Sequence, residues 1–143
     1  MKLLVLLRNW ITSNFFIGTD IVQVERIQLL LDKQKDQFIN RIFTINESSY
    51  CLSKANPAIH FAGRFAAKES IKKALYSANQ IQSLEFNKIE ILSMDNGAPY
   101  IKAIEGISFK ELKISISHES DYAIAMAMVL LWIIFYQKIK PMN

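Results

Sequence analysis

The sequence of 143 residues is poor in cysteine, with Cys51 alone, and it contains no internal repeats and no low-complexity linker. A single cysteine excludes an internal disulfide, which fits a reducing compartment, so we expect a cytoplasmic protein. A chain of this length suits one domain that buries about two thirds of its unfolded surface without a covalent staple. We therefore expect one compact domain.

Long hydrophobic runs are also missing. The stretch 122–136 carries no charge, but it is shorter than the roughly 18 to 20 residues of a membrane-spanning helix. The initial apolar run is broken by Arg8, whereas a secretory signal needs a longer apolar core and a small-residue cleavage site. We expect residues 1–14 to be an N-terminal extension, 15–130 to be the domain, and 131–143 to be an apolar, then basic, tail.

No long basic run is present, although the formal net charge is +4 and the isoelectric point is near 9.2. A basic chain favours an acidic partner, such as a nucleic acid, a phosphorylated small molecule or an acidic protein. Lysine and arginine are spread along the chain, with local concentrations at 33–35 and 64–73. This distribution suits a phosphate pocket better than a duplex track, so we expect no nucleic-acid partner.

The first half of the chain predicts a strand followed by helices. Residues 15–24 are rich in β-branched and aromatic side chains, which favour a strand, and 25–43 have helical apolar spacing. The Thr-x-x-Glu pattern at 44–47 predicts a capping box that opens a short helix. A longer central helix is expected over about 58–78, and we interpret His60 near its start as a surface residue rather than a ligand.

The second half predicts strands. Apolar residues alternate with charged ones around Ile89 and Ile91, and the turn residues 95–99 then predict a hairpin. Two further strands follow, one ending at His118 and one running through Val129, and alternation in the last strand indicates that both of its faces are buried. The whole is an α+β fold, with helices before an antiparallel sheet.

The central helix carries a carboxylate in line with its apolar side. Steps of three and four place Glu69 behind Phe65, with Lys73 one turn further on, whereas Arg64 and Lys68 point elsewhere. A carboxylate turned toward the interior costs several kcal/mol unless a cation or strong donors meet it, on an order-of-magnitude estimate. A pair with Lys73 would be the simplest solution, and it stabilises a helix by only about half a kcal/mol.

A second acidic residue, Asp20, lies in an equally apolar setting in the first strand, where Gly18 lets another backbone or a ligand approach closely. Two carboxylates in apolar surroundings indicate a metal site. The structural alternatives remain open: Asp20 caps the following helix, Lys73 only pairs with Glu69, and His118 is a hydrogen-bonded turn residue.

Three segments carry a family resemblance. They are GTDI at 18–21 with ERI at 25–27, FAGRFAAKE at 61–69 with KA at 73–74, and SISHE at 115–119. Together with NGAP at 96–99, they resemble holo-acyl-carrier-protein synthases, the short trimeric type of 4′-phosphopantetheinyl transferase. The resemblance spans roughly residues 15–129, and the central motif is long and specific.

The resemblance implies transfer of the 4′-phosphopantetheine group of coenzyme A to a serine of apo-acyl carrier protein, in support of fatty acid biosynthesis. The products are holo-acyl carrier protein and 3′,5′-ADP. Asp20 and Glu69 match the residues that bind Mg²⁺, and Glu69, Lys73 and Asp20 match the catalytic residues. The serine proton leaves through either Glu69 or a metal-bound water.

The resemblance also implies the binding residues and the assembly. Arg64, Lys68, Lys73 and His118 match positions that hold coenzyme A, and Arg26 matches a position that faces the carrier protein. The implied fold is an antiparallel sheet packed with a long central helix, and the implied assembly is a homotrimer with active sites at subunit boundaries.

One departure from the family and two competing functions follow. Residues 76–80 read YSANQ where the family commonly has a glycine-containing turn, which is expected to alter backbone contacts near coenzyme A.

The first alternative function is a noncatalytic module that binds a carrier protein or coenzyme A. The second, a protein of membrane surfaces or nucleic acid, rests only on the charge and the tail.

Overall fold

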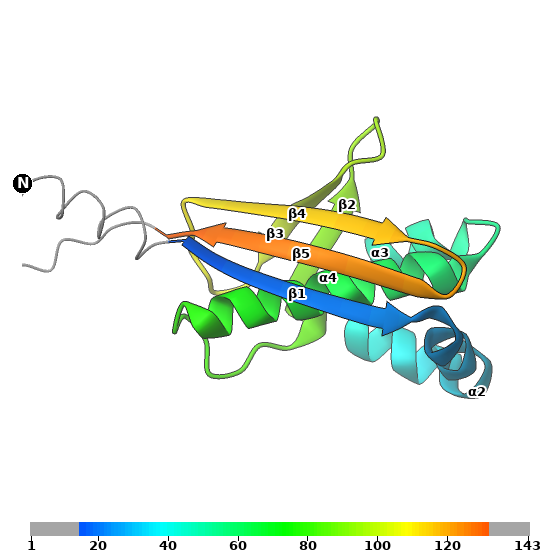
Figure 1. Ribbon diagram of the computed structural model, residues 1–143. Coiled ribbons are helices and arrows are strands. Elements are labelled where there is room, and N and C mark those ends of the chain that lie inside the picture. Colours follow the sequence, from blue (N-terminus) through cyan, green and yellow to red (C-terminus); the bar gives the residue numbers. More distant parts are fainter. Residues whose placement is uncertain (1–14, 132–143) are drawn as a thin grey trace, which may run out of the picture.

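A long helix, α4 (Pro57–Ser77), packs on one face of a three-stranded antiparallel sheet in the computed structural model, which describes residues 15–131 (Figure 1). The sheet consists, in spatial order, of β1 (Phe15–Gln23), β5 (Tyr122–Leu130) and β4 (Glu111–His118). The remaining elements are α2 (Val24–Ile42), α3 (Ile45–Leu52), the short 3₁₀ helix η1 (Phe86–Lys88), β2 (Ile89–Ser93) and β3 (Pro99–Ile104). The expected α+β fold with an antiparallel sheet and a central helix is confirmed.

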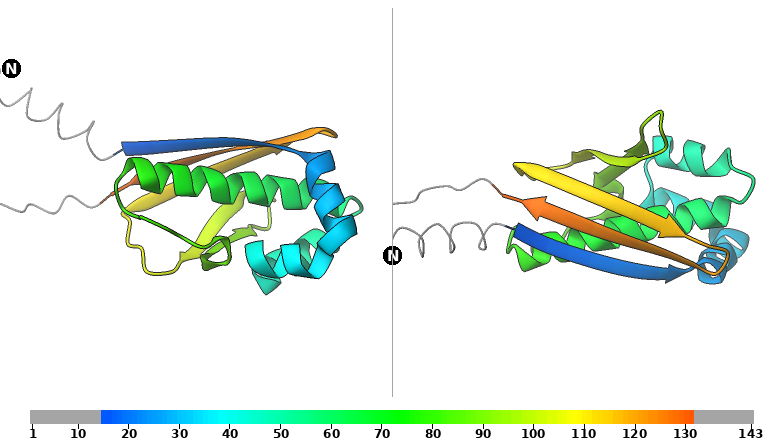
Figure 2. Two further views of the ribbon diagram at one scale, coloured as in Figure 1. Left: turned by 90° about the horizontal axis from the view of Figure 1, so that it is seen from below. Right: turned by 45° about the horizontal axis from the view of Figure 1, so that its top comes forward.

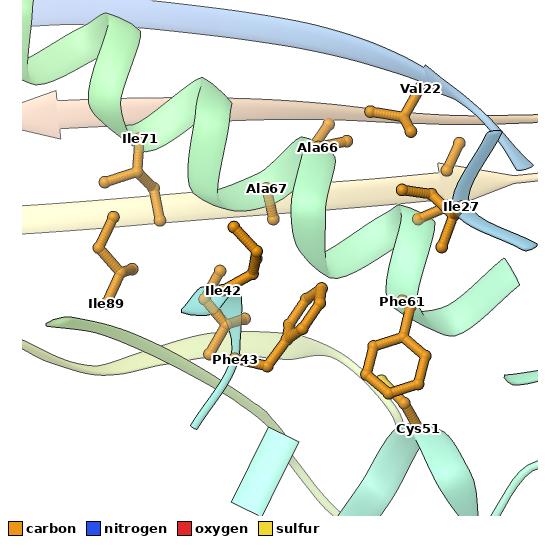
Figure 3. Close-up of a cluster of buried hydrophobic side chains, with 14 of the residues drawn as sticks. Val22, Ile27, Ile42, Phe43, Cys51, Phe61, Ala66, Ala67, Ile71 and Ile89 are labelled. Carbon is orange, nitrogen blue, oxygen red and sulfur yellow. The ribbon is translucent and has the colours of Figure 1, made fainter. Parts of the chain in front are cut away.

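The helix α4 is enclosed on two sides. Figure 2 shows it between the three-stranded sheet and the antiparallel hairpin of β2 and β3. In Figure 3, buried side chains of β1, α2, α3 and β2 converge on α4 from around its circumference. The labelled residues are Val22, Ile27, Ile42, Phe43, Cys51, Phe61, Ala66, Ala67, Ile71 and Ile89. The most buried element of the described chain is therefore the one that carries the central motif.

Small residues let α4 lie close to the sheet. The inward positions of β5 are mainly alanine, and all of them are buried. At Gly18 of β1, an added Cβ would overlap Ser70 O and would lie 2.6 Å from Ala74 N, so the backbone of α4 touches the strand here. The close approach expected at Gly18 is made by this helix.

The end of α4 forms the turn that the family usually builds with glycine. Asn79 has a positive φ of 57°, and the Gln80 and Asn79 N–H groups donate to the carbonyls of Leu75 and Tyr76 at 3.0 Å each. This is the Schellman arrangement of a helix C-terminus, in which asparagine can take the place of glycine. Asn79 thus supplies the left-handed residue of this turn without glycine.

The last strand is buried on one face only, so the expectation of two buried faces is wrong for the described chain. Ile124 and Met126 of β5 are about half exposed, at 49% and 47%. Together with exposed side chains of β1 they form an apolar patch that we call the outer sheet face. Its members are Phe15, Ile17, Ile21, Tyr122, Ile124 and Met126. No described element covers this face, because α4 packs on the opposite one.

The expected N-terminal extension, 1–14, and residues 132–143 of the expected tail lie outside the described residues. Within residues 15–131, no helix combines the length and the apolar character needed to cross a membrane.

Candidate functional site

Asp20 and Lys73 meet where β1 lies against α4. Lys73 Nζ donates to Asp20 Oδ1 at 2.8 Å and to the Thr19 carbonyl at 2.9 Å. The Asp20 side chain is 16% exposed, whereas that of Lys73 is 51% exposed. Gln23, rather than Asp20, is the N-cap residue of α2. The Asp20 carboxylate therefore does not cap α2. It is paired with Lys73 of α4.

Glu69 lies one turn before Lys73, about 40° away around the axis of α4. Its side chain is half-buried, and none of the ion pairs within residues 15–131 involves it. The interpretation that Lys73 only pairs with Glu69 is wrong, because Lys73 pairs with Asp20 instead. We call Asp20, Glu69 and Lys73 the carboxylate half-site.

Lys68 is the charge that faces the interior. Its side chain is fully buried, and its Nζ lies 2.7 Å from Glu47 Oε2. The same ammonium donates to the carbonyls of Ile42, Phe86 and Ile89 at 2.9, 2.9 and 2.6 Å. Burial lowers the pKa of Lys68, and the Glu47 carboxylate opposes that shift.

This placement corrects the burial expected from helical spacing. Helical spacing pointed Lys68 and Arg64 away from the interior, yet both are buried, while Glu69 is only half-buried. The Lys68 ammonium, expected to hold a phosphate, is enclosed here and has four oxygen partners. Lys68 instead ties α4 to α2, α3 and the start of β2.

A second group of polar side chains lies on the other flank of α4, near the end of β4. The Arg64 guanidinium stacks over the Tyr50 ring at 4.2 Å, and Nη2 donates to Ser93 Oγ at 3.2 Å. Arg64 is only 4% exposed, and its Nε is buried without a hydrogen-bond partner among the described residues. An unpartnered buried guanidinium donor favours an anionic ligand, because leaving it unsatisfied is costly.

Arg64 lines a cleft of about 110 Å³ that we call the arginine cleft. Its lining residues are Tyr50, His60, Gly63, Arg64, Ser93, Gly97, Pro99, Ile116 and His118. An added Cβ at Gly63 would lie 3.0 Å from Ile116 Cγ2 and 4.0 Å from His118 Cδ2, so β4 approaches α4 closely here. The structure thereby brings His118 beside Arg64, as members of one cleft.

His60 also belongs to this cleft, which the sequence interpretation missed. Its ring lies edge-on to the His118 ring, with centroids 5.5 Å apart, and 5.8 Å from the Tyr50 ring. Burial lowers the pKa of His60, and nearby His118, Lys54 and Arg64 lower it further. The spacing of four residues between His60 and Arg64 was the available signal, because it places both on one side of a helix.

The two groups are separated by the middle of the sheet. Asp20 is in β1, opposite Ala125 of β5, whereas His118 is in β4, opposite Ala123 of the same strand. Since adjacent strands are about 5 Å apart, β1 and β4 are separated by about 10 Å. Glu69 and Arg64 also project from α4 about 140° apart. One chain therefore carries the carboxylate half-site and the arginine cleft on different flanks of its central helix.

Arg26, the expected contact to a carrier protein, lies elsewhere. It is exposed in the first turn of α2, directly after β1. Lys33 and Lys35 are exposed further along α2, on either side of Gln34, whose backbone is not helical. The start of α2 thus presents Arg26 shortly after the end of β1, the strand that carries Asp20. None of the ion pairs within residues 15–131 involves Arg26.

A family model described as the 4′-phosphopantetheinyl transferase superfamily matches residues 16–127 of this chain. Among curated proteins, the holo-[acyl-carrier-protein] synthase of Protochlamydia amoebophila is 44% identical over 116 residues, covering 78% of this chain and 94% of the relative. The protein of the same name from Thermodesulfovibrio yellowstonii is 42% identical over 113 residues, covering 79% and 96%.

Solved structures are similar along the same range. The ACPS–CoA complex of "Chronobacterium ammoniagenes" has a TM-score of 0.71 and 26% identity, covering 82% of this chain and 98% of the other. The Helicobacter pylori holo-[acyl-carrier-protein] synthase in complex with coenzyme A has a TM-score of 0.69 and 32% identity, covering 79% and 98%. The matched range, residues 16–127, includes both the carboxylate half-site and the arginine cleft.

Proposed function

Because the chain belongs to the 4′-phosphopantetheinyl transferase superfamily, we propose that it transfers the 4′-phosphopantetheine group of coenzyme A to a serine of apo-acyl carrier protein. The products are holo-acyl carrier protein and 3′,5′-ADP, and the reaction serves fatty acid biosynthesis. The observation that carries the proposal is the largely buried Asp20 carboxylate 2.8 Å from Lys73 Nζ, with Glu69 one turn before Lys73 and free of ion pairs among residues 15–131.

The carboxylate half-site fits Mg²⁺. This ion usually takes one or two protein carboxylates and completes its shell with water and substrate phosphate oxygens. Within residues 15–131, no group of three or more His, Cys, Asp or Glu side chains gathers as a complete metal cage. Asp20 and Glu69 would hold the ion, and when bound it stabilises negative charge on the pyrophosphate.

Lys73 and Glu69 are the two side chains of this protein that act directly in the transfer reaction. The Lys73 ammonium has three donors, of which two are used by Asp20 and Thr19, so one remains for a phosphate oxygen. Glu69 accepts the proton of the carrier serine hydroxyl. The serine oxygen then bonds to the phosphorus of phosphopantetheine, and the bond from that phosphorus to the 3′,5′-ADP oxygen breaks. Lys73 stabilises the charge left on the departing group.

The arginine cleft holds a phosphate of coenzyme A in this proposal. Arg64 offers its unpartnered Nε, and guanidinium groups form strong, directional hydrogen bonds with phosphate. His118 lies at the same cleft and adds a second nitrogen donor. The cleft and the carboxylate half-site would thus bind separate parts of one coenzyme A molecule.

We further propose a homotrimer whose active sites lie between subunits. The apolar outer sheet face supports an interface, since large exposed apolar patches mark protein contacts. The placement of the two groups on different flanks of α4 favours a site in which the carboxylate half-site of one chain faces the arginine cleft of the next. We also propose a cytoplasmic location, consistent with the lone, buried Cys51.

Arg26 provides the contact to the carrier protein in this proposal. It is exposed near the start of α2, shortly after β1 ends at Gln23. Carrier proteins of this type present an acidic helix to their enzymes, so a cation here would steer and orient the encounter.

The test is intact-mass measurement of an apo-acyl carrier protein incubated with this chain, coenzyme A and Mg²⁺. We expect the carrier to gain the mass of one phosphopantetheine group, and the gain to disappear when a chelator is added. A chain that binds coenzyme A but adds no mass to any of several carriers would instead be a noncatalytic binding module.

A further inference from the structure

We propose that His60 is an additional phosphate-binding residue of the arginine cleft, and that it takes up a proton when the phosphate binds. This inference rests on the proposed function, because coenzyme A and 3′,5′-ADP are the phosphate ligands considered. It adds a residue to the cleft that the central motif does not contain. It also makes the affinity for these ligands depend on pH.

The composition of the cleft favours an anion. None of its described lining residues is acidic, whereas Arg64 and two histidines contribute to it. Arg64 is 4% exposed and its buried Nε has no described partner. A further cation, Lys54, lies over the Tyr50 ring at 4.4 Å, on the same ring that stacks with Arg64. The cleft is thus a cationic pocket with an unused buried donor.

The position of His60 favours a role beyond packing. Its ring is half-buried and meets the His118 ring edge-on, with centroids 5.5 Å apart. The hydrogen bonds within residues 15–131 include none from either nitrogen of His60. Aromatic contact alone would be met equally well by phenylalanine, whereas an imidazole at a cationic cleft has two nitrogens to offer a phosphate.

Burial and the surrounding charges together shift the pKa of His60. The groups that face it are Tyr50 from α3, Lys54 from the following loop, Arg64 on its own helix and His118 from β4. Burial first, then His118, Lys54 and Arg64, lower the pKa of His60, which favours the neutral ring in the free protein.

A bound phosphate opposes the effects that lower the pKa of His60. Its negative charge favours the imidazolium and raises the pKa of His60 in the complex. When a pKa is higher in the complex than in the free protein, a proton is taken up on binding. The affinity is then highest at low pH, and it falls as the pH rises through the pKa of the complex.

The experiment is isothermal titration calorimetry of the full chain with 3′,5′-ADP, in buffers of different ionisation enthalpy. Near pH 7 we expect the wild-type chain to take up protons on binding, and His60→Gln to take up measurably fewer. At about pH 6 we expect His60→Gln to bind about tenfold more weakly than the wild type, with a smaller difference at about pH 8. Lys110→Gln, which removes an exposed cation outside the cleft, should behave as wild type.

A second variant separates binding from packing. His60→Lys carries a permanent charge, so it should bind at about pH 8 more tightly than His60→Gln and without proton uptake from this position. The inference is overturned if His60→Gln, folded by circular dichroism, shows wild-type proton uptake and wild-type pH dependence. That outcome leaves the transferase proposal standing, because the intact-mass assay with the wild-type chain tests it separately.

Discussion

Replacing Glu69 with glutamine, or Asp20 with asparagine, is expected to abolish measurable transfer, a loss of at least about a thousandfold. Both changes are nearly isosteric and remove one negative charge from the proposed metal pair. Glu69→Gln also removes the proposed proton acceptor. The measurement is the rate of phosphopantetheine gain by apo-acyl carrier protein, followed by intact mass.

The same variants are expected to remain folded. Glu69 is only half-buried and takes part in none of the ion pairs within residues 15–131. Asp20 loses a pair with the half-exposed Lys73, which contributes about 1 kcal/mol or less. Glu85→Gln, at an exposed carboxylate outside the site, is the matched control and should transfer normally. Normal rates in both Asp20→Asn and Glu69→Gln would show the metal-pair assignment to be wrong.

Replacing Lys68 with methionine is expected to lower the free energy of unfolding by about 3 to 5 kcal/mol. The change leaves the fully buried Glu47 carboxylate without its cation, and it leaves three carbonyls without their ammonium donor. Urea denaturation followed by circular dichroism measures the loss. Lys72→Met, which removes a neighbouring and less buried lysine, is the control and should cost much less.

A double variant identifies the cause. Glu47→Gln combined with Lys68→Met removes both charges of the buried pair. The new amide side chain keeps an oxygen that can accept the Ile91 N–H, which now donates to Glu47 Oε1 at 3.0 Å. We therefore expect the double variant to be less destabilised than the sum of the two single variants. Additive losses, or a loss of less than about 1 kcal/mol in Lys68→Met, would contradict a stabilising buried pair.

The sequence predicts the elements well because most of them have local signals. The Thr44 and Glu47 spacing predicts a capping box, and the structure contains both of its hydrogen bonds. The same sequence does not reveal that the Glu47 carboxylate also meets Lys68 in the interior. That contact joins α3 to α4 through tertiary packing, for which a local pattern carries no information.

Helical spacing predicted the wrong burial for Arg64 and Lys68 in α4, for a physical reason. Helical spacing separates a buried side from an exposed side only when one side faces water. Because α4 lies between the sheet and the hairpin, Arg64 and Lys68 are buried even though their spacing points them away from the apolar stripe. The pair of Asp20 and Lys73 could not be predicted from spacing either, since it depends on how β1 lies against α4.

We expect the carboxylate half-site and the arginine cleft, carried on different flanks of one chain, to act together on one coenzyme A across a subunit boundary. The most direct test is complementation between Asp20→Asn and Arg64→Gln, coexpressed with different tags and purified through both. Each variant alone should be inactive or nearly so in the intact-mass assay, and each should be shown to fold.

We expect the mixed assembly to recover about a third of the wild-type rate, because a cyclic trimer that contains both variants has one site of three in which an intact half-site faces an intact cleft. Such recovery requires that Asp20 of one chain work with Arg64 of another. A mixed assembly no more active than the better of the two single variants would contradict the shared site, and with it this account of how the chain transfers phosphopantetheine.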